Sequence, residues 1–250
     1  MQGKVNKYLV GGAVAVFWMT AWALLSGAVS EEILLPSPAK VCETLWVMWG
    51  TAVFWRSVAL SLVRILSGFA AAVLVGTLLA VLTTHCRPLH VLLSPLLHIV
   101  RAAPVASFII LAYVWLRVQI LPAFIAFLMV VPLIWANVCE GIHNTDKKLL
   151  ETARVFRLGQ WKTLTLIHLP SVRPYFIAAC TTGLGFAWKS GIAAEVICTP
   201  ADSIGKQLYS AKAYLETPEV FAWTATVVLL SVLLERVLLQ ATRRRKVVSV

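Results

Sequence analysis

Charged residues are scarce in this 250-residue chain, because Asp, Glu, Lys and Arg together make up only 13% of it. A typical soluble domain has about a quarter of its residues charged. Hydrophobic residues supply 60% of the sequence. This balance excludes an ordinary soluble domain. It predicts an all-α polytopic membrane protein, whose apolar side chains face lipid as well as each other.

Residues that carry chemistry are also few. The chain has eleven acidic residues and five His, spread too thinly for the clustered His, Asp or Glu of an integral-membrane enzyme. Its five Cys form no C-x-x-C pair, and no carboxylate completes a metal site beside His85, Cys86 and His90. The phosphate-binding pattern G-x-x-x-x-G-K-[ST] is missing as well. Any energy that the protein uses must therefore come from a partner or from an ion gradient.

The net charge of +11 follows membrane topology. No separate basic domain exists to bind nucleic acid. Apolar runs predict about six spans, with both termini on one side. Thirteen Lys and Arg then lie on the inside and five on the outside, as the positive-inside rule requires. The predicted spans are about 8–29, 58–84, 89–116, 120–140, 174–197 and 220–240.

Two connections differ from plain loops. Residues 30–57 contain Trp46, Trp49 and Trp55, which favour an outside segment with a helix at the membrane interface. The third span contains Arg101 and Pro104, which predict two half-helices or a strong kink.

The segment 146–170 is charged and amphipathic, and lies between apolar runs. Apolar residues recur every three or four positions up to Leu158, and Gly159 breaks the pattern. A second short apolar face starts at Trp161, and Pro170 is expected to end the pattern. Two short helices at an angle could dock into another protein. A helix lying on anionic lipid would explain the periodicity equally well.

The same segment resembles the E-A-A loop of binding-protein-dependent ABC importer permeases. Glu151, Thr152 and Ala153 match the start of that loop, and Ile167, Leu169 and Pro170 match its end at the family's spacing. One feature departs from the family. Arg157 stands where the usual Gly would be, and a Gly comes two positions later, at 159.

Residues 55–240 resemble the nitrate/sulfonate/taurine branch of these permeases. The likeness rests on motifs in three spans: Ser61-Leu62-Val63-Arg64 with Gly68-Phe69, Pro95 with Arg101-Ala102-Ala103-Pro104, and Ala187-Trp188 with Ala194-Glu195. The resemblance implies a type I importer permease (MetI-like) fold, forming a single transmembrane domain over 1–250. It also implies that the coupling residues are Glu151, Thr152, Ala153, Gly159, Ile167, Leu169 and Pro170.

The resemblance further implies the transmembrane subunit of an ATP-driven importer, in the cell membrane of a prokaryote with both termini cytoplasmic. Two ATP-binding subunits would use ATP and Mg²⁺, and this chain would bind no cofactor. A second permease copy would complete the pathway. An extracytoplasmic binding protein would deliver a small solute such as a nitrate-, sulfonate- or taurine-like anion.

Charges within the spans are costly and are therefore expected to face protein or water. Glu195 is expected to pair with an Arg of another span. For Arg64 and Arg101, structural pairing or snorkelling is favoured over contact with the substrate. Small residues recur every four positions in the fifth span, which favours helix packing and leaves a pathway wall as the alternative. The candidate pathway residues are Arg64, Arg101, Gly183, Ala187, Lys189, Gly191 and Glu195.

An ion-coupled secondary transporter is the main alternative function. It would explain the spans and the charges within them. It predicts internal repeats or broken helices with ion ligands, and it leaves the segment 146–170 without a role.

Overall fold

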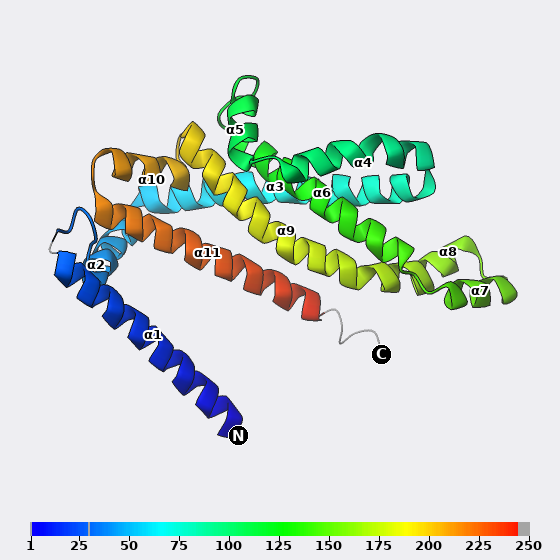
Figure 1. Ribbon diagram of the computed structural model, residues 1–250, viewed down its shortest axis with the longest axis horizontal. Helices are drawn as coiled ribbons and strands as arrows, with labels where there is room; N and C mark the ends of the chain where they lie inside the picture. Colours follow the sequence, from blue (N-terminus) through cyan, green and yellow to red (C-terminus); the bar gives the residue numbers. More distant parts are fainter. Residues whose placement is uncertain (1, 30, 245–250) are drawn as a thin grey trace.

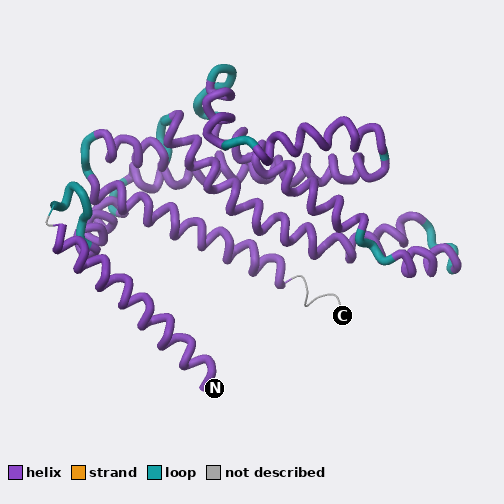
Figure 2. Tube along the Cα trace, in the orientation of Figure 1, coloured by secondary structure: helices purple, strands orange, loops and turns teal. Residues whose placement is uncertain are grey.

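The computed structural model describes residues 2–29 and 31–244, which are almost entirely helical and contain no strand (Figures 1 and 2). In chain order the helices are α1 (Gln2–Val29), α2 (Pro38–Trp49), α3 (Ala52–His85), α4 (Arg87–Ala102), α5 (Val105–Tyr113), α6 (Leu121–His143), α7 (Lys147–Val155), α8 (Gln160–Thr163), the π-helical turn η1 (Leu164–His168), α9 (Leu169–Cys198), α10 (Ile204–Ala213) and α11 (Thr217–Arg244).

The core lies where α6 packs between α3 and α9. Buried side chains from all three helices meet there, including Ile65, Ile134 and Trp188. Small residues bring the backbones close together: a methyl group at Gly68 of α3 would overlap the Ala123 carbonyl of α6. The helices therefore pack by direct backbone approach, as is usual for membrane bundles.

In the part of the chain that the structure describes, four helices are long and apolar enough to cross a membrane: α1 from Gly11, α3, α6 and α11 to Thr242. A fifth span is possible if α4 and α5 count as one bent unit. The 30-residue α9 is long enough to cross but is not among the strongly apolar helices. The apolar helices confirm the prediction of a multi-span α-helical protein, and the count of six stays a prediction.

The predicted break in the third span is confirmed. Helices α4 and α5 meet at 104°, and Ala103 between them has extended backbone angles. Pro104 causes this break, because its ring disfavours a helical residue before it and it has no N–H to continue the hydrogen-bond ladder. The turn places Arg101 at the end of α4, beside the break.

The two ends of the bundle differ. Helices α2 and α10 lie at one end, and α7 and α8 project from the other (Figure 1). The helix expected in 30–57 is present as α2, and Trp46 within it is 75% exposed. Its place at the membrane interface stays a prediction. Helix α1 is joined to this end through Trp22, whose Nε1–H donates to the Pro36 carbonyl, and otherwise diverges from the bundle.

Several predicted boundaries were wrong. Helix α3 begins at Ala52 rather than at 58, and α9 begins at Leu169 rather than at 174. Pro170 does not end a helix; it lies in the first turn of α9, directly after η1. The i→i+5 turn of η1 has the Leu169 N–H bonded to the Leu164 carbonyl, and such wider turns make room for a proline ring. The 199–219 segment contains the half-buried helix α10.

Candidate functional site

Residues 146–168 form a projection, which we call the knob, beyond the end of the bundle (Figure 1). Asp146 starts it by capping α7, because its carboxylate accepts a hydrogen bond from the Lys148 N–H at 2.8 Å. Asn144 fixes the junction to the bundle: its Nδ2 donates to Glu140 Oε1 and to the Tyr175 hydroxyl. The predicted pair of short helices is present as α7 and α8.

The bend between α7 and α8 occurs at Arg157. The Leu158 N–H bonds to the Ala153 carbonyl at 2.9 Å and the Arg157 N–H to the Arg154 carbonyl at 3.0 Å. This is a Schellman ending, in which the residue at the Arg157 position adopts the left-handed conformation. Arg157 does so, with φ of 49°. The bend therefore stays where the family has its Gly, whereas Gly159 has an ordinary φ of −64°.

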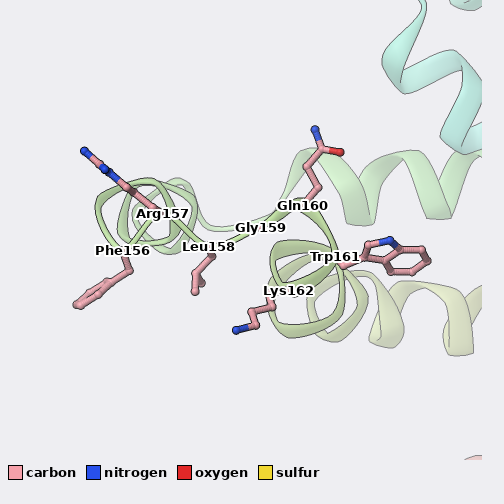
Figure 3. Close-up of a pocket in the computed structure, with 7 residues that line it drawn as sticks. All are labelled: Phe156, Arg157, Leu158, Gly159, Gln160, Trp161 and Lys162. Atoms are coloured by element: carbon pink, nitrogen blue, oxygen red, sulfur yellow. The ribbon is translucent and has the colours of Figure 1, made fainter.

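The knob exposes large apolar side chains among its charged residues. Val155 is 78% exposed, Phe156 72% and Trp161 78%. Phe156 and Trp161 border an open groove of about 630 Å³ lined by residues 156–162. Figure 3 shows Phe156 and Trp161 projecting in opposite directions from the turn. Large apolar side chains at this exposure are typical of a surface that a partner covers.

The predicted coupling residues divide into two groups. Ala153 of α7 and Ile167 of η1 are buried. Glu151, Thr152 and Gly159 are exposed on the knob, and Leu169 and Pro170 are exposed where it meets α9. The continuous helix from η1 into α9 connects the knob directly to the bundle core. A displacement of the knob can therefore be transmitted along α9.

A buried polar cluster lies around Glu195 of α9, at the end of the bundle opposite the knob. Glu195 is fully buried. Its Oε2 accepts hydrogen bonds from Ser61 Oγ at 2.7 Å and from the Gly205 N–H at 3.2 Å. Its Oε1 lies 3.8 Å from Arg64 Nη1. The expected partner from another span is therefore Arg64 of α3.

Arg64 also holds the loop between α9 and α10. Its guanidinium donates to the carbonyls of Ala201 and Asp202 at 2.9 and 3.2 Å. Thr199 and Asp202 in this loop have positive φ, of 46° and 50°. Left-handed backbone costs non-glycine residues roughly 1–2 kcal/mol each. The hydrogen bonds to Arg64 help to keep the loop in this conformation.

The small-residue ridge of α9 packs inside the chain. A methyl group at Gly191 would lie 2.6 Å from Ile65 Cγ1, and one at Gly183 would lie 3.1 Å from Val130 Cγ1. Ala187 is fully buried between them. The geometry thus corresponds to helix packing. The alternative, a pathway wall made of Gly183, Ala187, Gly191 and Glu195, is not supported, because these residues are covered by α3, α6 and α10.

Two other membrane cations differ from Arg64. Arg101 of α4 and Lys189 of α9 are exposed. Among the side chains that the structure describes, in residues 11–29 and 31–242, neither cation makes an ion pair or a hydrogen bond. Of the two roles favoured for Arg101, structural pairing is not seen in this part of the chain, and snorkelling stays a prediction. Both cations remain candidates for contact with solute or with another subunit.

Two features of these sites were not predicted from the sequence. The role of Ser61 was missed, although its hydroxyl also accepts the Ile204 N–H and so joins α3 to α10. Ser61 lies one turn before Arg64, and this i, i+3 spacing was the available signal. The left-handed conformation of Arg157 was also missed, because the residue type disfavours it.

The sequence is similar to those of known transport permeases. Over 240 residues it is 25% identical to the taurine transport system permease protein TauC of Escherichia coli (strain K12), covering 94% of this chain and 86% of that one. Over 159 residues it is 30% identical to the bicarbonate transport system permease protein CmpB of Synechococcus elongatus, covering 63% and 57%.

The fold matches a solved structure. A crystal structure of an amino acid ABC transporter with histidines superposes with a TM-score of 0.65, covering 77% of this chain and 94% of that one at 14% identity. This likeness supports the predicted MetI-like permease fold. The family model for binding-protein-dependent transport system inner membrane components matches residues 72–246.

The match covers most of the chain and includes the knob, α9 and α11. This protein therefore belongs to the family of binding-protein-dependent transport system inner membrane components, as an ABC importer permease of the nitrate/sulfonate/taurine type.

Proposed function

We propose that this permease carries a small oxyanion inward and is driven by two ATPase subunits that dock on the knob. The observation that carries the proposal is the exposed apolar surface of Val155, Phe156 and Trp161, at the end of a helix continuous with the core. An ATPase partner would cover these side chains. Closure of the ATPase pair on ATP would then move α9 through η1.

The oxyanion part of the proposal has two supports. The relatives are named for taurine and bicarbonate transport. In this chain, Arg101 and Lys189 carry positive charge within helices of the bundle and are exposed without an acidic partner among the described residues. Charged side chains within membrane-spanning segments are expected to face water or protein. They would attract an anion in transit.

The remaining parts of the assembly follow the family pattern. A second copy of this chain would complete the pathway, and an extracytoplasmic binding protein would deliver the solute at the α2 and α10 end. The knob and both termini would lie in the cytoplasm, in keeping with the excess of Lys and Arg there. Residues 1–250 would act as one permease domain without a bound cofactor, and ATP and Mg²⁺ would bind to the ATPase subunits.

An ion-coupled secondary transporter is disfavoured by membership of this family and by the knob. Such a transporter has no need for an apolar docking surface outside the membrane. A gradient-driven mechanism would be demonstrated if vesicles containing only this chain accumulated solute without ATP.

The test of docking compares two exposed tryptophans. Trp161→Ala changes the knob, where Trp161 is 78% exposed. Trp46→Ala changes the opposite end, where Trp46 is 75% exposed. We expect Trp161→Ala to reduce co-purification of the ATPase subunit and ATP-driven uptake at least about tenfold, in the range of an interface hot spot. Trp46→Ala should change neither. Equal retention of the ATPase by both variants would contradict docking at the knob.

A further inference from the structure

Helix α4 has polar side chains along one face. Arg87, His90, Ser94, His98 and Arg101 follow one another at intervals of three or four residues. At about 100° per residue they fall within an arc of about 80°. We call this face the polar stripe. Its length and its mixture of Arg, His and Ser are unusual for a helix packed against membrane spans.

A different face of α4 is suited to lipid. Leu92, Leu96 and Ile99 are all apolar and between 56% and 71% exposed. Leu97 and Val100 form a third, buried face. Because the apolar exposed face is separate, the polar stripe does not have to point into the hydrocarbon. It lies at the edge of the contact between α4 and the bundle.

Contacts with Trp135 of α6 fix the direction of the polar stripe. The ring centroids of His90 and His98 lie 5.6 and 6.3 Å from that of Trp135. Trp135 is held in turn by its Nε1–H, which donates to Thr83 Oγ1 of α3 at 2.8 Å. The polar stripe therefore runs along the surface of α6, beside the core, and remains partly open.

Arg101 is the deepest member of the polar stripe. It lies fourteen residues beyond Arg87 on α4, which corresponds to about 21 Å of helix. The hydrocarbon core of a bilayer is about 30 Å thick, so Arg101 would lie within the membrane when α4 enters it from the Arg87 end. Arg64 is paired with Glu195, but Arg101 has no ion pair in the described parts of the chain.

We propose that the polar stripe is one wall of the water-filled pathway, and that Arg101, His98 and Ser94 contact the oxyanion as it passes. The assignment rests on the proposed function, because it presumes an anion in transit. A guanidinium donates two parallel hydrogen bonds to planar or tetrahedral oxyanions. The hydroxyl and imidazole groups along the same face supply further polar contacts at successive depths.

Cysteine labelling tests this without knowledge of the substrate. The complete complex is used, with exposed Cys42 and Cys86 replaced by Ser. Ser94→Cys places a thiol on the polar stripe, and Leu96→Cys places one on the apolar face at similar depth. Each variant is treated with two water-soluble methanethiosulfonates, one with a sulfonate and one with a trimethylammonium group. Arg101→Gln is then added to each variant.

We expect Ser94→Cys to react and Leu96→Cys to remain unlabelled. The anionic reagent should react faster at position 94, and Arg101→Gln should lower the ratio of anionic to cationic rates about threefold or more. The proposal is overturned if position 94 is unreactive, which would show a face covered by protein. It is also overturned if Arg101→Gln leaves the rate ratio unchanged.

Uptake measurements separate this inference from the proposed function. With the complete complex and taurine, sulfonate and bicarbonate as probes, Arg101→Lys should retain more uptake than Arg101→Gln. In the wild type, ATP hydrolysis should be coupled to uptake of the solute. Absence of ATP-driven uptake in the wild type would refute the proposed function. Normal uptake by Arg101→Gln would refute only the role of the polar stripe.

Discussion

Arg64 of α3 and Glu195 of α9 form an ion pair at 3.8 Å, although the two residues are 131 positions apart in sequence. The carboxylate is fully buried, and the Arg64 side chain is 16% exposed. Ser61 and the Gly205 N–H bind the other carboxylate oxygen. The cluster therefore ties α3, α9 and α10 together at the end of the bundle opposite the knob.

Removing Arg64 alone should strongly destabilise the protein, because it leaves the Glu195 charge buried without its cation. Such losses are about 3–5 kcal/mol, reduced here by the two hydrogen bonds that remain. Arg64→Met should lower the melting temperature in detergent. The double variant, Arg64→Met with Glu195→Gln, should recover part of this loss in melting temperature, since it carries no buried charge in the cluster. A double variant as unstable as the single one would contradict this pairing.

Arg157→Gly should stabilise the knob. Arg157 has φ of 49°, which costs a non-glycine residue roughly 1–2 kcal/mol, and part of this is offset by the greater freedom of Gly in the unfolded chain. Hydrogen exchange of the α7 amides should slow in Arg157→Gly. Arg154→Gly lies within the helix and should destabilise α7 by about 1 kcal/mol. Exchange of the α7 amides should therefore be faster in that variant. Faster exchange in both variants would argue against strain at position 157.

Changes on α7 should uncouple ATP hydrolysis from transport. Glu151→Lys reverses an exposed charge, and Ala153→Leu forces a large side chain into a site that is only 4% exposed. Both variants should remain in the membrane yet lose solute-stimulated ATPase activity in the assembled complex. Ala213→Leu, exposed on α10 at the other end, serves as the control. Normal stimulation in the α7 variants would exclude a coupling role.

Gly191 and Gly185 offer a matched test of helix packing on α9. Gly191→Ala places a methyl group 2.6 Å from Ile65 Cγ1, whereas a methyl group at Gly185 meets no atom within 4 Å. Gly191→Ala should destabilise by about 1–3 kcal/mol, and Ile65→Val should partly restore stability. Gly185→Ala should be neutral or stabilising by up to about 1 kcal/mol. Thermal unfolding in detergent measures both, and equal effects would contradict the close contact.

The broken third span illustrates what local sequence can specify. Pro104 removes an N–H and restricts Ala103 wherever it stands in a chain, so the turn was predictable from residue type. Pro170 illustrates the opposite case. The same chemistry led to the wrong prediction there, because the π-helical turn just before it gives the proline room and lets the helix continue.

The sequence by itself determined the membrane-spanning character, the kink at Pro104 and the position of the knob, since hydropathy, proline geometry and short-range spacing are local properties. The tertiary structure alone decided which charges are paired. Arg64 and Arg101 both lie in apolar helices, but only Arg64 meets a carboxylate, because α3 packs against α9 where Glu195 is buried. Long-range packing fixes such pairs, and no periodicity along one helix contains that information.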